Sequence, residues 1–196
     1  VARYHKAGEK EVNMAIEAAL DAKKEWENTS WVERASILAR IGQLIATKYR
    51  ARVNASCMLG QSKNAFQAEI DSACEAIDFF RFNNYYASNL YAEQPSSSPD
   101  QLNRTEYRPL EGFVMAVTPF NFTSIASNLN MTPVLMGNTT IWKPSTTALL
   151  SNYHLMQIFM EAGLPAGVIN FLPGKGSLIG NIALSNPNLA GIHFTG

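Results

Sequence analysis

Asn121 stands between two aromatic residues, Phe120 and Phe122, in the second half of this 196-residue sequence. A carboxamide can donate N–H bonds to an oxygen that gains negative charge during a reaction, so Asn121 could stabilise an oxyanion. The other interpretation is that Asn121 caps the helix that follows, which is the commoner role of an isolated asparagine at such a position. The sequence leaves both roles open.

Lys143 and a pair of glycines form two more candidate anion sites. Lys143 follows a short apolar segment and precedes Pro144; its ammonium there suits a phosphate or a ribose hydroxyl, although a solvated surface lysine is the alternative. Gly174 and Gly176 permit a close backbone approach, and a helix N-terminus behind them would favour an anion. Glycine is also the usual residue of a tight turn, and Gly180 falls one position too late for the G-x-G-x-x-G dinucleotide motif.

The cysteines and histidines form no recognisable catalytic set. Cys57 and Cys74 fall in helical stretches, where buried cysteines mostly behave as small apolar residues, so we interpret both as inert. Two cysteines without a C-x-x-C spacing argue against a zinc site or a disulfide scaffold, and they favour a reducing compartment. The histidines have no serine, cysteine or carboxylate partner at a telling distance in the sequence; they are His5, His154 and His193.

Strands and helices that alternate along residues 112–196 would position these candidates. The expected strands are 112–117, 139–142, 168–172 and 189–194, and the expected helices are 122–136, 148–162 and 177–184. Such alternation implies right-handed crossovers and a parallel sheet. Because ligands bind outside the carboxyl ends of such strands, we expect the segments after the strands to form one site.

The first half of the sequence is predicted to be helical. One helix is expected over 9–27, a second begins at the capping box of Ser30 and Glu33, and a third covers about 63–86. The residues expected to face inward on the third helix are Phe66, Ile70, Ala73, Ile77 and Phe80. Two prolines around three serines at 95–99 predict an exposed loop, and a short strand is expected at 105–108.

The composition narrows the class of protein. Sixteen basic and sixteen acidic residues cancel, whereas a nucleic-acid binder would show a basic excess on one face. No apolar stretch approaches the roughly 20 residues that a membrane-spanning helix needs. We therefore expect a small-molecule ligand, and neither nucleic acid nor a membrane as a partner.

Four motifs follow the predicted strands: Thr118-Pro119-Phe120-Asn121-Phe122, Trp142-Lys143-Pro144-Ser145, Leu172-Pro173-Gly174-Lys175-Gly176 and Phe194-Thr195-Gly196. They stand in the order and spacing of the aldehyde dehydrogenases, which this sequence resembles. Three further segments are Phe66-Gln67-Ala68-Glu69-Ile70-Asp71 with Glu75, Ile77-Asp78-Phe79-Phe80-Arg81-Phe82-Asn83, and Tyr107-Arg108-Pro109-Leu110-Glu111-Gly112-Phe113. These resemble the delta-1-pyrroline-5-carboxylate dehydrogenases, the subfamily that oxidises glutamate γ-semialdehyde, and the resemblance covers nearly the whole chain.

The resemblance implies an α/β fold in which a helical N-terminal region packs on a parallel, Rossmann-like cofactor-binding sheet. Residues 1–94 would form the helical part of the cofactor-binding domain. Residues 95–111 would form a loop and a strand of the kind used in oligomerisation. Residues 112–196 would form the parallel β/α part, which we expect to be incomplete at its C-terminal end.

The resemblance also implies roles for single residues. Asn121 matches the amide that donates to the oxyanion of the thiohemiacetal. The positions that match contacts to the cofactor, NAD, are Thr118, Phe120, Lys143, Ser145, Gly176, Gly180 and Gly196. Glu75 and Phe122 match positions that line the aldehyde pocket of the subfamily. No metal is implied.

The implied activity is oxidation of L-glutamate γ-semialdehyde to L-glutamate with NAD, in proline catabolism. The family's nucleophilic cysteine and general-base glutamate are expected beyond Gly196, because neither Cys57 nor Cys74 matches the nucleophile's motif. We therefore expect an N-terminal part of a longer enzyme, inactive by itself. Thr146 and Thr147 stand where many relatives carry an acidic residue that reads the ribose hydroxyls, which weakens the preference for NAD over NADP.

Three alternatives stay open at this point. The parent could be an aldehyde dehydrogenase with another substrate, a natural short form that acts as a non-catalytic binding subunit, or a fused bacterial enzyme that also oxidises proline. The family leads us to expect a homodimer or a higher homo-oligomer. It implies the mitochondrial matrix for a eukaryotic source and the cytoplasm for a bacterial one.

Overall fold

Four apolar segments in the second half of the chain pair as parallel strands of one sheet. The computed structural model describes residues 2–196 and places the strands in the order β3-β2-β1-β4. The strands are β1 (Phe113–Val117), β2 (Thr139–Lys143), β3 (Ile169–Phe171) and β4 (Leu189–Phe194). The predicted strands and the predicted parallel sheet are confirmed.

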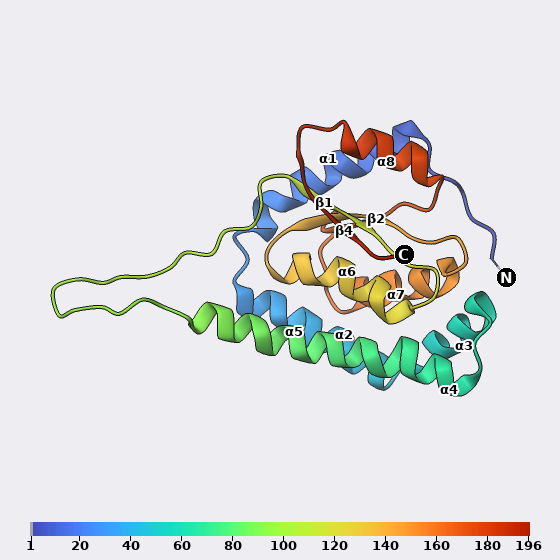
Figure 1. The fold of residues 1–196 in the computed structure, drawn as a ribbon, viewed down its shortest axis with the longest axis horizontal. Coiled ribbons are helices and arrows are strands. Elements are labelled where there is room, and N and C mark those ends of the chain that lie inside the picture. Colours follow the sequence, from blue (N-terminus) through green and yellow to red (C-terminus); the bar gives the residue numbers. More distant parts are fainter. Residues whose placement is uncertain (1) are drawn as a thin grey trace.

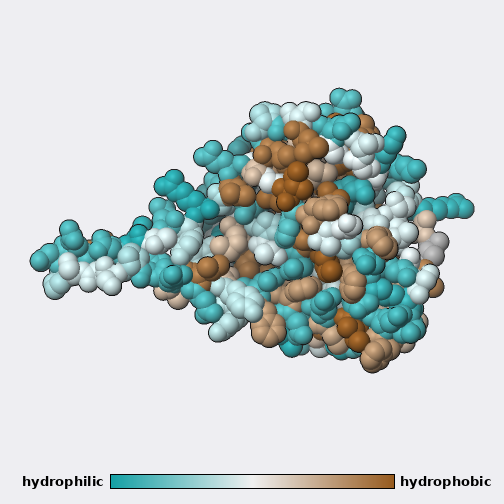
Figure 2. Space-filling model, in the orientation of Figure 1, coloured by the Kyte–Doolittle hydropathy of each residue, from teal (hydrophilic) through white to brown (hydrophobic). Residues whose placement is uncertain are grey.

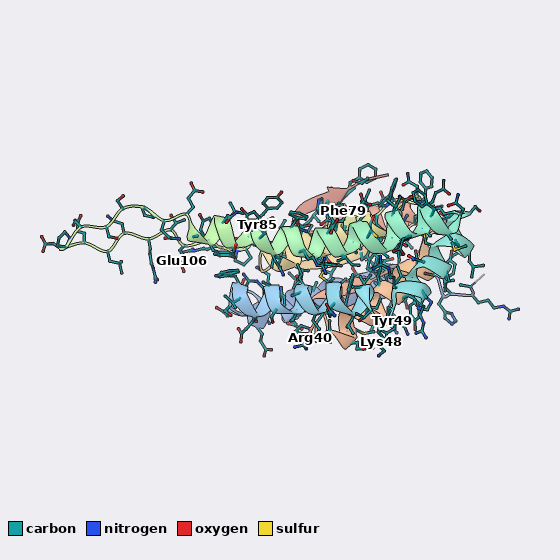
Figure 3. All side chains as sticks on the ribbon, turned by 90° about the horizontal axis from the view of Figure 1, so that it is seen from below. Arg40, Lys48, Tyr49, Phe79, Tyr85 and Glu106 are labelled. Carbon is teal, nitrogen blue, oxygen red and sulfur yellow. The ribbon has the colours of Figure 1, made fainter. Side chains whose placement is uncertain are left out.

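Helices cover both faces of this sheet (Figure 1). The helices are α1 (Glu9–Trp26), α2 (Trp31–Ala46), α3 (Arg50–Gln61), α4 (Ala65–Ala68), α5 (Glu75–Ala92), α6 (Thr123–Leu135), α7 (Leu149–Glu161) and α8 (Gly176–Leu184), with a π-helix, η1 (Glu69–Cys74), between α4 and α5. Helices α1 and α8 lie on one face, and α6 and α7 lie on the other. Helices α2 and α5 pack side by side as an outer layer beneath α6 (Figure 3).

Two apolar cores result from this layering. On the side of α1 and α8, Val12 and Ile16 pack with Phe113 and Ile141 of the sheet. On the other side, a larger core joins the sheet to the helical layers and contains fully buried Trp142. Burial on both faces explains why the central strands β1 and β2 show no polar–apolar alternation, whereas β4 at the edge of the sheet is only partly buried.

The expected helix starts are seen at atomic detail in α2. Ser30 Oγ accepts a hydrogen bond from the backbone N–H of Glu33 at 3.2 Å, and the Glu33 carboxylate accepts one from the backbone N–H of Ser30 at 3.1 Å. Both bonds satisfy backbone donors that lack a partner inside the helix. The capping box is therefore confirmed.

The prediction of one continuous helix over 63–86 is wrong in detail. The structure has α4, the π-helix η1 and then α5, which continues to Ala92. Phe66 and Ile70 are 75 % and 44 % exposed rather than buried, whereas the later predicted residues, from Ala73 on, are buried. A π-helical turn contains about one residue more than an α-helical turn, so the inward face shifts in phase across η1.

The predicted strand at 105–108 is absent from the structure. Residues 93–111 form a long arm that projects from the end of α5 (Figure 1), and residues 105–108 have no ladder partner in the described part of the chain. The one bridge near its tip joins Ser98 to Gln101. A strand requires a second strand for its backbone hydrogen bonds, so the apolar and β-branched residues here cannot form one alone.

Candidate active site at the carboxyl edge of the sheet

The segments that follow β1, β2 and β4 lie together at one edge of the sheet. The backbone N–H of Thr118 donates to the carbonyl of Lys143 at 3.2 Å, and the N–H of Thr195 donates to the carbonyl of Val117 at 3.2 Å. A Cβ atom built on Gly196 would lie 3.8 Å from Cα of Pro119. The strands end in register, with Val117 opposite Lys143 and Phe194, which brings the three segments to one place.

Thr118 fixes the first of these segments to the sheet. Its side chain is 4 % exposed, and its hydroxyl accepts a hydrogen bond from Nε1 of Trp142 at 2.9 Å. The Trp142 ring is fully buried and meets Phe171 of β3 edge to face, with ring centroids 4.9 Å apart. The first residue after β1 is thus anchored to β2 by both its backbone and its side chain.

Lys143 extends towards the N-terminus of α8. A Cβ atom built on Gly176 would lie 3.6 Å from Cε and 3.8 Å from Nζ of Lys143. Lys143 forms no ion pair with any residue in 2–196. A lysine ammonium and the positive end of a helix repel each other unless an anion or an electron-rich hydroxyl lies between them, so this place suits a phosphate or a ribose.

The other predicted cofactor contacts lie in more open surroundings. Gly180 on α8 is open, since a Cβ atom there would meet nothing within 4 Å. Ser145 lies in the segment after β2, with its hydroxyl 3.3 Å from that of Thr147. Phe120 is 58 % exposed. All of these leave accessible surface for a flat ligand along α8 and the sheet edge.

The structural reason for a glycine at position 174 differs from that at nearby Gly176. Gly174 forms an isolated parallel bridge with Ala7, and a Cβ atom on it would lie 3.2 Å from the carbonyl oxygen of Ala7. Its lack of a side chain therefore allows the N-terminal segment to pack beside the sheet. Only the second glycine of the pair borders Lys143.

Asn121 does not cap α6. The N-cap position is Phe122, and the helix has no side-chain cap. The carboxamide of Asn121 is half-buried and makes no hydrogen bond to the residues that the structure describes. The capping interpretation is wrong, and the amide donors of Asn121 stay available at the edge of the sheet.

Phe122 is the N-cap residue of α6, and Glu75, the first residue of α5, reaches the start of α6 with its side chain. The Glu75 carboxylate accepts a hydrogen bond from the hydroxyl of Ser124, which is buried in the first turn of that helix. The ring of Phe122 lies under the ammonium of Lys63, with Nζ 4.3 Å from the ring centroid, and Lys63 is paired with Asp71. A carboxylate, an aromatic ring and the amide of Asn121 thus meet around one helix N-terminus, where negative charge is favoured.

Two residues of this region were missed by the sequence reasoning. Gln61 donates from Nε2 to the carbonyl of Phe120 at 2.8 Å, and its Oε1 accepts from the hydroxyl of Thr123 at 2.9 Å. A Cβ atom on Gly60 would lie only 2.8 Å from the carbonyl oxygen of Thr147. A glutamine and a glycine at the end of a helix carry no recognisable pattern, so only the tertiary structure reveals them.

The cysteines have the environment of unreactive thiols. Cys57 is fully buried, and this burial raises the pKa of its thiol. Cys74 is half-buried; burial first, and then a hydrogen bond to Glu69, raise the pKa of its thiol. Both thiols are protonated at neutral pH, and the nucleophile is the thiolate. Among residues 2–196 no cluster of three His, Cys, Asp or Glu side chains could hold a metal ion.

A parallel sheet with cofactor-type loops at its carboxyl edge and an amide at the head of the next helix defines a class of protein. The chain matches the aldehyde dehydrogenase family over residues 1–196 and belongs to that family. The resemblance inferred from the four motifs is confirmed. No helix in the described part of the chain combines the length and apolarity needed to span a bilayer.

Among its relatives the chain is similar to delta-1-pyrroline-5-carboxylate dehydrogenases. It is 55 % identical over 197 residues to the probable enzyme of Schizosaccharomyces pombe, covering 100 % of this chain and 36 % of the relative. It is 48 % identical over 196 residues to the human mitochondrial enzyme, covering 100 % of this chain and 35 % of the relative. The chain therefore spans about a third of the length of these relatives.

The fold agrees with solved structures of the same subfamily. The Mycobacterium tuberculosis delta-pyrroline-5-carboxylate dehydrogenase bound with NAD superposes with a TM-score of 0.94 at 51 % identity, covering 96 % of this chain and 35 % of that chain. The Thermus enzyme with bound NAD superposes with a TM-score of 0.86 at 32 % identity, covering 95 % and 36 %.

Proposed function

We propose that this chain forms the cofactor-binding part of a protein that oxidises L-glutamate γ-semialdehyde to L-glutamate with NAD, in proline catabolism. The observation that carries the proposal is the uncommitted carboxamide of Asn121 on the same sheet edge as the unpaired ammonium of Lys143. One group is suited to a reacting oxygen and the other to a nucleotide. The similarity to delta-1-pyrroline-5-carboxylate dehydrogenases supports the choice of aldehyde.

The residues along the edge fit a dinucleotide. Lys143 beside the N-terminus of α8 would hold a ribose or phosphate, and the open face at Gly180 leaves room for an adenine. The remaining contacts are assigned to Thr118, Phe120, Ser145, Gly176 and Gly196. When bound, NAD supplies the acceptor for the hydride. With Thr146 and Thr147 exposed and no carboxylate there, the preference for NAD over NADP rests on the relatives.

Asn121 contributes to the chemistry through charge. As a nucleophile attacks the aldehyde carbon, the aldehyde oxygen gains negative charge, and an amide donor fixed beside it stabilises that charge more than it stabilises the neutral aldehyde. Removal of one such donor costs about 10²–10³ in kcat. Glu75, at the start of α5, and Phe122, at the start of α6, would line the aldehyde pocket. Neither Cys57 nor Cys74 is assigned as the nucleophile.

The arm and the compartment complete the proposal. We assign residues 1–94 and 112–196 to cofactor binding and residues 95–111 to oligomerisation, so that the protein forms a homodimer or a higher homo-oligomer. Several eukaryotic relatives are named mitochondrial. A eukaryotic source would therefore place the protein in the mitochondrial matrix, and a bacterial source would place it in the cytoplasm.

The test uses the protein expressed at its natural length. Wild type should reduce NAD with glutamate γ-semialdehyde and release glutamate, with a higher kcat/KM than for propanal. Asn121→Ala should lower kcat by about 10²–10³ and leave the Kd for NAD within about twofold. Lys143→Met should raise that Kd by about tenfold, the loss of one charged contact.

Three outcomes would contradict the proposal. A higher kcat/KM for another aldehyde would contradict the proposed substrate and leave the membership of the aldehyde dehydrogenase family intact. Absence of any aldehyde oxidation would favour a non-catalytic binding subunit. An unchanged kcat in Asn121→Ala would remove the oxyanion role. A control variant, Lys48→Met, removes a lysine whose partner is Glu161, far from the edge, and should leave NAD binding unchanged.

A further inference from the structure

We propose that Gln61 is a positioning residue that holds the loop of Asn121 in its working geometry, an inference that rests on the proposed function. Gln61 is the last residue of α3, far from Asn121 in sequence. It makes no hydrogen bond to the carboxamide of Asn121, and of the proposed cofactor contacts it bonds only to the backbone carbonyl of Phe120. Its side chain instead forms hydrogen bonds to the backbone before Asn121 and to the start of α6 after Asn121.

The hydrogen bonds of Gln61 span the loop. Nε2 donates to the carbonyl of Phe120, the residue before Asn121, at 2.8 Å. Oε1 accepts from the hydroxyl of Thr123, two residues after Asn121, at 2.9 Å. Asn121 itself forms no side-chain hydrogen bond in the described region. The position of its carboxamide therefore depends on how firmly its neighbours are held.

The neighbours of the Gln61 amide permit only one orientation. The Phe120 carbonyl can only accept a hydrogen bond, so it must face Nε2. The thiol of Cys57 donates to Oε1 at 2.8 Å. Because burial raises the pKa of this thiol, it keeps its proton at neutral pH and stays a donor. A flipped amide would lose the bonds to Phe120 and Cys57, whereas the Thr123 hydroxyl can pair with either orientation, so the first two bonds fix the amide.

Helix α3 gives Gln61 a fixed support. Gly60, the preceding residue, approaches the carbonyl oxygen of Thr147 so closely that a Cβ atom would lie 2.8 Å from it. On the inner side of the helix, Val53 and Cys57 are fully buried. The end of α3 is thus wedged between the loops that follow β1 and β2. A reacting group is held within a fraction of an ångström only when its supporting residues are themselves locked by packing.

The kinetic test compares two glutamine variants in the protein at its natural length. Gln61→Met keeps the length of the side chain and removes its hydrogen bonds, and it should lower kcat by about 10–100-fold with KM within about twofold. The matched control is Gln43→Met on α2, whose side chain is exposed, and it should leave kcat unchanged. Gln61→Glu keeps the acceptor and removes the donor to Phe120; it should lose kcat similarly, and it serves if Gln61→Met does not fold.

A double variant separates positioning from a general effect on the fold. If Gln61 acts through Asn121, then adding Gln61→Met to Asn121→Ala should cause no further loss of kcat. An equal loss in both backgrounds, or a change confined to KM, would overturn the inference.

Amide hydrogen exchange gives a readout that needs no activity. The peptide that contains residues 118–123 should exchange faster in Gln61→Met than in Gln43→Met, while the strands stay unchanged. Unchanged exchange in this peptide would also overturn the inference. If wild type oxidised no aldehyde, the proposed function would fail by itself, and the exchange experiment would still decide whether Gln61 holds the loop.

Discussion

The loop at 118–122 and the arm at 93–111 are both irregular backbone, yet they are held in opposite ways. The loop receives hydrogen bonds from Trp142 on β2 and from Gln61 on α3. The arm beyond its base bonds mainly to itself, as between Ser97 and Asn103. Its surface is mostly polar in Figure 2. Irregular backbone is therefore fixed where side chains from other elements satisfy its polar groups.

The arm is fixed only where it leaves the body of the protein. Tyr91 stacks on Trp31 with ring centroids 5.2 Å apart, and Tyr107 meets Tyr91 edge to face at 5.3 Å. Nη2 of the buried Arg34 donates to the hydroxyl of Tyr91 at 3.1 Å. This aromatic base sets the direction of the arm, whereas the loop of Asn121 is held by hydrogen bonds from two other elements.

The largest difference between the two regions should appear when a tryptophan is removed from each. Trp142→Ala should lower the free energy of unfolding by about 3–5 kcal/mol, because it leaves a cavity and removes the donor to Thr118. Trp31→Ala at the base of the arm, where the ring is only partly buried, should cost about 1 kcal/mol. Urea unfolding measures both, and equal losses would break the comparison.

A smaller effect is expected from the close contact of α3. Gly60→Ala should lower the free energy of unfolding by about 1–3 kcal/mol, because its Cβ would be forced against the Thr147 carbonyl. Gly180→Ala is the matched control, since a Cβ there meets nothing and alanine favours a helix by about 0.5–1 kcal/mol. Thermal unfolding at matched concentration would show the two variants moving in opposite directions.

The smallest effect is expected at the tip of the arm. Leu102 is 84 % exposed, so Leu102→Ser should change the free energy of unfolding by less than about 0.5 kcal/mol. The same substitution should weaken self-association if the arm contacts a second copy, which analytical ultracentrifugation over a range of concentrations measures. A marked loss of stability in the variant would show that the arm packs on the body of the protein.

The sheet was predictable from the sequence because its strands are short, largely apolar segments that alternate with helices, and β1 and β2 are buried. The signals that end the helices between the strands are equally local: Gly163 follows α7 with a positive φ of 97°, a conformation that favours glycine. The capping box of Ser30 is local as well. Predictions succeeded where the determinants lie within a few residues of one another.

The failures have causes that the local sequence pattern does not reveal. The exposure of Phe66 and Ile70 follows from a π-helical turn that no periodicity rule anticipates. The strand at 105–108 could not form without a partner. For the candidate site, the motifs placed Lys143 and Asn121 correctly after their strands. The hydrogen bonds of Gln61, however, join residues about 60 positions apart, and no pattern in either segment of the sequence predicts them.

The π-helix η1 has a consequence for how this sequence can change over evolutionary time. A π-helical turn contains about one residue more than an α-helical turn, so the deletion of one residue between Glu69 and Cys74 would convert η1 to regular α-helix and re-aim the side chains inside it. Asp71 lies inside this turn and pairs with Lys63, and Glu75 directly after it accepts a hydrogen bond from Ser124. Such a deletion would re-aim Asp71 and break its ion pair. The length of this segment should therefore vary less among functional homologues than its amino-acid identities.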